Sequence, residues 1–280
     1  MSLKSKLWLG QLSDTPVLRG LTKLLPMKYY YLTLLLGALG LTNCTVYTPL
    51  QPVLPTIRQA GQLEMRASLQ PTLRGEASVA YSLIKYVVVT AAGSWRPQLP
   101  MPYRILHRAW RTEVGIGTYL PLSSEWTLSA LGGVGWGKTD RSVYTQGIIP
   151  SLGPDFFSRY KTSFGQLSFS RQGYPFTVSY GYRLTQVDFH ELQTEKYDLP
   201  LETQWRHEPF FAIRVDLGGD KATTRWQTEL SGALSLSQPG RVESVDRVTP
   251  FAYETNLNRG GALLLGLGLL YRIPGRTKGL

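Results

Sequence analysis

Hydrophobic positions alternate with polar or glycine positions over most of the chain that follows residue 61. Between residues 176 and 184, for example, every second side chain is large and apolar, and the intervening ones are polar or small: FTVSYGYRL. Successive side chains of a β-strand point to opposite faces, so a period of two predicts strands with one apolar face. No comparable helical stripe appears. The pattern therefore predicts an all-β protein.

The alternation predicts ten strands. Their expected ranges are 62–70, 75–81, 86–96, 107–120, 126–138, 158–170, 175–189, 207–217, 223–237 and 256–272. Most have nine or more residues, whereas strands of soluble domains most often have about 5–6 and a membrane-crossing strand needs about 9–11. Aromatic residues lie toward the ends of the apolar face, and the other face carries charges, hydroxyls and glycine. This arrangement is typical of outer-membrane barrels, although a soluble β-sandwich also has alternating strands.

The links between the predicted strands give a second indication. The short links 82–85, 121–125, 171–174 and 218–222 alternate with the long links 97–106, 139–157, 190–206 and 238–255. Only the link 71–74 is short where a long one is expected. Short periplasmic turns and long outer loops are typical of outer-membrane barrels. We therefore predict a single antiparallel up-and-down transmembrane β-barrel over residues 62–273, with ten strands or alternatively eight, followed by a tail at 274–280.

The amino-terminal region resembles a secretory lipoprotein signal. Residues 29–42, YYYLTLLLGALGLT, follow Met27-Lys28 and precede Asn43-Cys44. Fourteen residues are too short to cross a bilayer as a helix, but they fit the apolar part of a signal peptide. Leu41, Thr42 and Cys44 match a lipobox, whereas Asn43 replaces the usual small residue. We expect a signal peptide at 27–43, an acylated Cys44 carrying palmitate or a similar chain, and a Pro-containing periplasmic spacer at 44–61. Residues 1–26 would be an over-called start or a disordered extension.

Composition excludes several classes of protein. The chain has 42% hydrophobic residues, 18% charged residues, 28 Gly and a single Cys. This apolar content excludes a disordered chain, and one thiol excludes a disulfide scaffold or a cysteine-based zinc site. Removing residues 1–43 takes away five cations and one acid, which lowers the net charge from +11 to +7. Without a basic helix or a known motif, this charge does not indicate nucleic-acid binding, and no metal or cofactor is expected.

Charged residues on the predicted lumen face carry both signs. Charges in a narrow interior have to pair, since an unpaired buried charge is costly, and ten strands are too few for the open channel of a large porin. We therefore expect ion pairs that hold the barrel together, formed among Glu64, Arg66, Glu113, Arg183, Arg214, Asp216, Arg225 and Glu229.

Three histidines, His107, His190 and His207, are the strongest candidates for catalysis. Asp188 and His190 lie on one face of a predicted strand, and a carboxylate beside an imidazole can act as a general base. This pair makes an outer-membrane hydrolase, either a protease or a lipid-modifying enzyme, one alternative. However, the pair shares its face with the lipid-facing residues, so we expect no catalysis there. A narrow small-solute channel is the second alternative.

The stretch from Cys44 to Trp95 resembles lipid-anchored outer-membrane barrel proteins of Bacteroidota. The matching residues are Cys44, Tyr47, Pro49, Pro55, Gly61, Ala80, Tyr81, Ser82 and Lys85. The resemblance implies the fold and the outer membrane, and it implies no reaction. Acidic residues that would signal surface export are absent at 45–48, so the resemblance places the anchor on the periplasmic side.

These observations predict an acylated outer-membrane barrel with a structural or interaction role in the bacterial envelope. Its expected partners are outer-membrane lipids. Lipopolysaccharide phosphates are a further expected partner, because an anionic membrane surface attracts cations at an interface. The candidate loop cations for that contact are Arg104, Arg108, Arg111, Arg241 and Arg247.

Overall fold

The computed structural model divides the chain into two units, Met1–Asn43 and Cys44–Leu280. It describes residues 47–97, 105–143, 153–194, 203–218, 225–237 and 262–275, all in the second unit. The predicted signal peptide and Cys44 lie outside the described residues. The same is true of most of the predicted tail and of the loop cations Arg104, Arg241 and Arg247.

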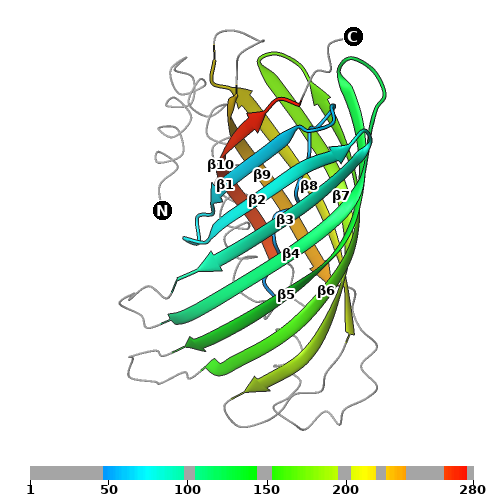
Figure 1. Cartoon of the computed structure of the whole chain (residues 1–280). Coiled ribbons are helices and arrows are strands. Elements are labelled where there is room, and N and C mark those ends of the chain that lie inside the picture. Colours follow the sequence, from blue (N-terminus) through cyan, green and yellow to red (C-terminus); the bar gives the residue numbers. More distant parts are fainter. Residues whose placement is uncertain are drawn as a thin grey trace, which may run out of the picture. The chain divides into compact units, whose positions relative to one another are not determined.

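Ten antiparallel strands close into one barrel, in which each strand pairs with its neighbours in sequence and β1 pairs with β10 (Figure 1). The strands are β1 Leu63–Leu69, β2 Gly75–Ile84, β3 Val87–Arg96, β4 Ile105–Pro121, β5 Trp126–Val143, β6 Gly153–Gln172, β7 Phe176–Thr194, β8 Thr203–Asp216, β9 Trp226–Ser237 and β10 Ala262–Ile273. The prediction of a single ten-stranded antiparallel barrel is confirmed. No helix among the described residues is long and apolar enough to cross a membrane.

Strands β4 to β7 extend further than the sequence predicts. They have 17 to 20 residues, and β6 begins at Gly153 where the alternation predicts residue 158. Pairing continues at these ends, although the sequence there no longer alternates strictly between apolar and polar residues. Hydropathy therefore marks the part of the strand against lipid, whereas the hydrogen-bonded strand is longer.

The outer surface of the wall has the pattern of a lipid-facing barrel. Exposed apolar side chains cover its middle, and tryptophans lie toward both ends, Trp110 near one and Trp126 near the other. On β4, ten residues separate Trp110 from Leu120, which is about 33 Å along the strand and about 25 Å along the axis of a barrel tilted by about 40°. An apolar band of about 25 Å between aromatic girdles is what an outer-membrane barrel presents to lipid.

The two mouths of the barrel differ. At one, here called the turn mouth, the links 85–86, 122–125 and 173–175 join consecutive strands. At the other, the long-link mouth, strands are joined through residues 97–104, 144–152, 195–202 and 238–261. Because outer-membrane barrels have short periplasmic turns and long outer loops, the long-link mouth is the outer one by this rule.

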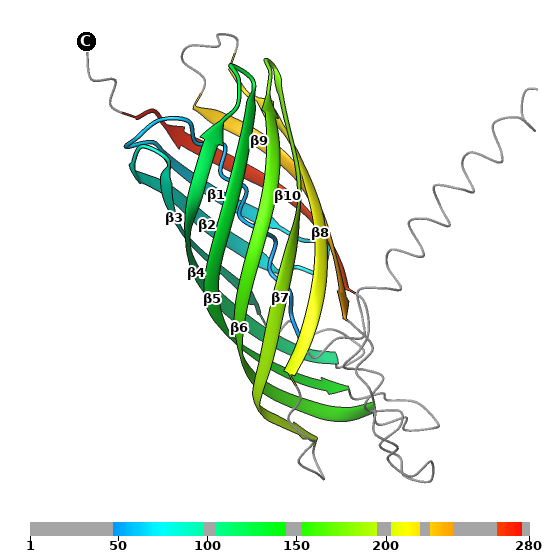
Figure 2. The same cartoon turned by 90° about the vertical axis from the view of Figure 1, so that its right-hand side faces the viewer.

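The lumen is filled by the chain itself. Residues 47–57 are buried inside the barrel, as the blue trace among the strands in Figure 2 shows. This differs from the sequence-based expectation of a periplasmic spacer at 44–61. Three prolines, Pro49, Pro52 and Pro55, lack the N–H that a sheet partner needs, which explains why the segment runs through the lumen without joining a strand.

Candidate functional site

The lumen segment, residues 47–62, runs from the long-link mouth toward the turn mouth. Tyr47 packs with Tyr160 and with Phe189 and Leu192, which lie near the long-link end of β7. Eleven residues later, Arg58 donates a hydrogen bond to the carbonyl oxygen of Ser124, in the turn between β4 and β5. The segment therefore passes along the length of the lumen before the chain enters β1.

Apolar side chains of the segment are buried against apolar parts of the inner wall. Leu50, Val53 and Ile57 belong to a cluster with wall residues that include Phe164, and Leu54 packs with Phe210. All four segment side chains are at most 6% exposed. Fully burying a side chain of this size contributes about 1.5–3 kcal/mol, so the segment is held by its apolar residues as well as by polar contacts.

Near the long-link mouth, the segment is held by a charged group of the wall. The Tyr47 hydroxyl donates to Glu208 Oε1 at 3.4 Å and accepts a hydrogen bond from Arg111. The guanidinium carbons of Arg111 and Arg206 lie 4.9 and 4.8 Å from the centre of the Tyr47 ring. Thr48 Oγ1 lies 3.1 Å from Thr139 Oγ1. The phenol is thus enclosed by two cations and one carboxylate.

Nearer the turn mouth, backbone groups of the segment bond to buried side chains of the wall. Arg214 donates to the carbonyl oxygen of Leu54 at 2.8 Å, and Gln166 donates to that of Val53 at 2.7 Å. The Glu64 carboxylate accepts from the Thr56 amide at 2.9 Å. A segment without a strand partner satisfies its buried backbone groups in this way.

The wall charges form ion pairs around the segment. Glu229 bridges Arg66 and Arg214, each at 2.7 Å. Glu113 lies 3.1 Å from Arg183 and 3.3 Å from Arg111, and all three side chains are at most 2% exposed. Further pairs join Arg272 to Glu64 at 3.0 Å, Arg214 to Glu64 at 4.0 Å and Arg74 to Glu76 at 3.0 Å.

The structure thus places six of the eight predicted lumen residues in ion pairs: Glu64, Arg66, Glu113, Arg183, Arg214 and Glu229. Asp216 instead accepts a hydrogen bond from Gln227 at 2.7 Å. The expectation for Arg225 is wrong, because Arg225 is exposed and precedes the first residue of β9. The interpretation of Arg111 as a loop cation is also wrong, since Arg111 lies in β4 and is fully buried.

Sequence reasoning missed the wall residues that hold the segment near the long-link mouth. Arg206 and Glu208 share their parity on β8 with Arg214, which the alternation had assigned to the lumen. Extending that parity along the strand identifies both. Tyr47 and Gln51 carry no such signal, because the segment has no regular period.

The candidate catalytic pair lies on the outside of the wall. Asp188 accepts hydrogen bonds from Gln186 and from Thr203, the latter at 2.7 Å, and His190 is exposed. Arg159 pairs with Glu191 while Tyr160 pairs with Phe189, so His190 is the extra residue of a β-bulge. His207 shares a hydrogen bond with the hydroxyl of Tyr182, and the side chain of His107 lies outside the described residues.

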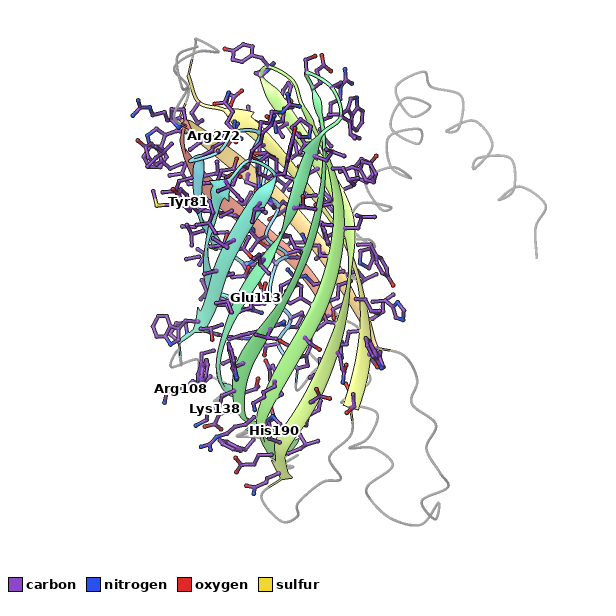
Figure 3. All side chains as sticks on the ribbon, turned by 45° about the vertical axis from the view of Figure 1, so that its right-hand side comes forward. Tyr81, Arg108, Glu113, Lys138, His190 and Arg272 are labelled. Atoms are coloured by element: carbon purple, nitrogen blue, oxygen red, sulfur yellow. The ribbon has the colours of Figure 1, made fainter. Side chains whose placement is uncertain are left out.

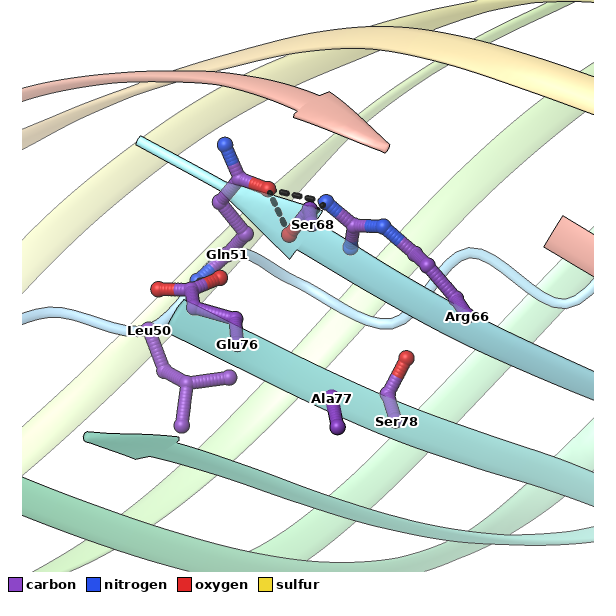
Figure 4. A pocket seen from close by; sticks show the side chains of 7 residues that line it. All are labelled: Leu50, Gln51, Arg66, Ser68, Glu76, Ala77 and Ser78. Carbon is purple, nitrogen blue, oxygen red and sulfur yellow. Dashed lines mark hydrogen bonds between the residues drawn. The ribbon is translucent and has the colours of Figure 1, made fainter. Parts of the chain in front are cut away.

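Little free space remains between the segment and the wall. One narrow gap is lined by Leu50, Gln51, Arg66, Ser68, Glu76, Ala77 and Ser78 (Figure 4). Gln51 crosses it, accepting hydrogen bonds from Arg66 and, at 3.5 Å, from Ser68. A second narrow gap lies beside Leu54 and Arg214. Among the described residues, no group of His, Cys, Asp and Glu is arranged to hold a metal ion.

Comparison with known proteins identifies similar folds and no family. No protein-family model matches the chain, and no curated protein matches it. Among solved structures, the outer membrane protease OmpT of Escherichia coli is 9% identical over 76% of this chain and 93% of that one, with a TM-score of 0.42. The KdgM porin is 8% identical over 75% and 98%, with a TM-score of 0.32. The translocator domain of the autotransporter NalP of Neisseria meningitidis is 9% identical over 75% and 86%, with a TM-score of 0.37.

These similarities are too weak to assign a function. The chain nevertheless has the fold of an outer-membrane β-barrel, as its closed ten-stranded sheet, apolar exterior and polar lumen show.

Proposed function

We propose that the protein is a closed outer-membrane barrel with a structural or interaction role in the envelope, anchored by acylation of Cys44 and without catalytic activity. The observation that supports this best is the lumen segment. Its residues 47–57 occupy the space through which a solute would have to pass, and all of them are buried.

The contacts of the segment favour a permanent plug over a loosely placed one. Apolar side chains, charged groups near the long-link mouth and backbone hydrogen bonds near the turn mouth all hold it. The two gaps beside the segment are narrow, and Gln51 crosses one of them. A continuous aqueous path for a hydrated ion would require the segment to leave.

Conductance in planar bilayers tests the closed state. We expect no conductance steps from the full barrel, and steps from a variant that lacks residues 47–56. Heat-dependent migration in SDS gels checks that the variant still forms a barrel. If the variant does not fold, substituting Leu50 and Leu54 with Ser provides a second way to loosen the segment. Steps of equal size and frequency from the unaltered barrel would contradict the proposal.

The direction of the segment bears on the side of the anchor. The sequence alone led us to expect a periplasmic anchor, but the segment runs so that Tyr47 lies toward the long-link mouth. Cys44 is three residues from Tyr47, and three residues reach at most about 11 Å. This supports an acyl chain on the same side of the membrane as the long links.

Two measurements test the anchor and its side separately. Labelled palmitate should be incorporated into the unaltered protein and lost in Cys44→Ala. An epitope inserted between Thr45 and Tyr47 should bind antibody in intact cells, and an epitope inserted in the turn at Ser123 should bind only after the cells are opened. An epitope near Tyr47 that is shielded in intact cells would return the anchor to the periplasmic side.

The absence of catalysis is proposed from the environment of the candidate pair Asp188 and His190. Asp188 is occupied by Gln186 and Thr203, and the bulge at His190 lies on the outer face. The purified barrel should not cleave a peptide panel or a lipid A preparation. Cleavage that disappears in His190→Ala would establish the hydrolase instead.

A further inference from the structure

A group of cations lies on the outside of β4, β5 and β6, next to the aromatic girdle at the long-link mouth. Its members are Arg108, Lys138, Arg159 and Lys161, here called the outer cation patch. Their side chains point away from the lumen, since their strand neighbours Ala109, Gly137, Thr139, Ser158, Tyr160 and Thr162 are buried. Figure 3 shows Arg108 and Lys138 together at one end of the barrel, opposite to Arg272.

Strand register brings the patch directly against the girdle. Lys138 is paired across the strands with Trp110 on one side and with Arg159 on the other. Lys161 is paired with Trp136. Tryptophan side chains mark the level of lipid headgroups in outer-membrane barrels. The cations therefore lie at and just beyond the headgroup level of the leaflet on the long-link side.

Most of this positive charge has no carboxylate partner. Among the residues that the structure describes, Arg108, Lys138 and Lys161 form no ion pair. Arg159 lies 3.4 Å from Glu191, and Asp140, opposite Arg108, is the one acid with a described side chain on this face of β4 to β6. On the adjoining strand, Asp188 is the register partner of Lys161, but its carboxylate accepts hydrogen bonds from Gln186 and Thr203 and forms no ion pair with Lys161.

Two cations of the patch form cation–π contacts with one aromatic ring of the wall. Lys138 Nζ lies 4.8 Å from the centre of the Phe157 ring, and the guanidinium carbon of Arg159 lies 5.3 Å from the same ring. Cations over an aromatic face are favoured by the ring quadrupole. Two of the four charges are thus positioned side by side rather than spread into solvent.

Next to the patch, on the side toward the middle of the barrel, the outer surface of the wall is apolar and locally smooth. Val114, Ile116 and Val134 are 49%, 59% and 44% exposed, and Gly132 is paired with Gly165 across β5 and β6. A Cβ added at Gly165 would meet no atom within 4 Å, so the surface there is open. A lipid with an anionic headgroup and several acyl chains would therefore meet cations at its headgroup and an open apolar surface along its chains.

We propose that the outer cation patch binds a phosphorylated glycolipid of the outer leaflet, such as the lipid A part of lipopolysaccharide, through its phosphates. This inference rests on the proposed outer-membrane location and does not depend on the lumen segment or on Cys44. Charge complementarity at the headgroup level selects the phosphates, and the apolar surface beneath selects a lipid over free phosphate.

The test uses the full barrel in nanodiscs and bisphosphorylated lipid A as the probe. Each neutralised cation near a charged membrane surface is expected to weaken binding about fivefold, so Lys138→Gln with Lys161→Gln should weaken it about 25-fold. Lys85→Gln is the matched control, because Lys85 is exposed in the turn between β2 and β3 at the other mouth. Folding of each variant is checked by heat-dependent migration in SDS gels.

Two further arms identify the ligand. Lipid A without phosphates should bind the unaltered barrel no more tightly than bisphosphorylated lipid A binds the double variant. Millimolar inorganic phosphate should not displace the bisphosphorylated lipid from the unaltered barrel. Equal binding by the double variant and the unaltered barrel would overturn the proposal, as would displacement by inorganic phosphate alone. Because conductance and palmitate labelling do not enter this experiment, its failure leaves the proposed closed barrel untouched.

Discussion

Arg108 and Arg111 are three residues apart on β4, and they face opposite sides of the barrel wall. Arg111 is fully buried in the lumen, where it contacts Glu113 and the Tyr47 hydroxyl. Arg108 is exposed on the outside and forms no ion pair with a described residue. The same type of side chain is therefore part of a hydrogen-bonded ion-pair network on the inner face and is free to bind a ligand on the outer face.

The difference follows from the surroundings of each face. Inside, a guanidinium that loses its carboxylate has neither water nor lipid phosphate to replace it, and most of the described lumen charges form ion pairs. Outside, at the level of the headgroups, a cation is solvated and gains little from a protein partner. We infer that lumen charges serve the fold and that outer charges are available for a ligand, and the following predictions test that distinction.

The largest effect is expected from Glu113→Gln. This substitution keeps the size of the side chain but leaves Arg111 and Arg183, both fully buried, without their shared carboxylate. Breaking a buried pair by removing one partner costs about 3–5 kcal/mol. We expect a loss of this order in the free energy of unfolding, measured by tryptophan fluorescence during urea titration of the barrel in detergent.

The matched control is Glu125→Gln at the turn mouth. Glu125 lies 3.0 Å from Arg171, and the two side chains are 48% and 60% exposed. An exposed pair contributes about 0–1 kcal/mol. Equal losses for Glu113→Gln and Glu125→Gln would mean that burial does not separate the two kinds of charge.

Tyr47→Phe should have the next largest effect. It removes the hydroxyl that accepts from Arg111 and donates to Glu208, and hydrogen bonds to charged groups contribute about 1.5–3 kcal/mol. Tyr119→Phe is the comparison, because Tyr119 is equally buried but shares a hydrogen bond with the neutral Ser82 at 3.0 Å. Its expected loss in the same urea titration is about 1 kcal/mol. A smaller loss at Tyr47 than at Tyr119 would contradict a charged anchor for the lumen segment.

The sequence predicts the wall far better than it predicts the lumen segment. Alternation assigns Glu113 and Arg183 to the lumen because side chains along a strand alternate between its two faces, and this alternation does not depend on what each face contacts. The same rule places Arg111 inside, two residues from Glu113. Grouping Arg111 with the nearby loop cations obscured that assignment.

The contents of the lumen depend on contacts between distant residues. Tyr47 meets Glu208 across 161 positions of the sequence, and a segment with three prolines has no period from which its orientation could be derived. The bulge at His190 likewise depends on how β7 pairs with β6, and the periodicity of the β7 sequence alone does not predict it. Local pattern therefore predicts which face a residue occupies, and the fold decides what that face meets.

Two glycines extend the comparison to packing. At Gly137, on the lumen face, an added Cβ would lie 2.4 Å from the Tyr160 ring, which contacts Tyr47 and Thr48. Overpacking of this kind costs about 1–3 kcal/mol, so Gly137→Ala should destabilise the barrel by that amount. Gly165→Ala, on the outer face, should change the free energy of unfolding by less than about 0.5 kcal/mol. Urea titration of both variants measures the difference, and equal values would show that the lumen accommodates the extra methyl group.

The smallest effect on stability is expected from Lys161→Gln in the outer cation patch. Lys161 is exposed and forms no ion pair with a described residue, so its loss should change the free energy of unfolding by less than about 0.5 kcal/mol. The same titration in detergent, free of lipid A, measures this value. A loss above 1 kcal/mol would show that the outer charge supports the fold, and weaker lipid binding by the variant could then reflect a damaged wall. A negligible loss makes weaker binding a property of the surface itself, because the wall that carries the cation is unchanged.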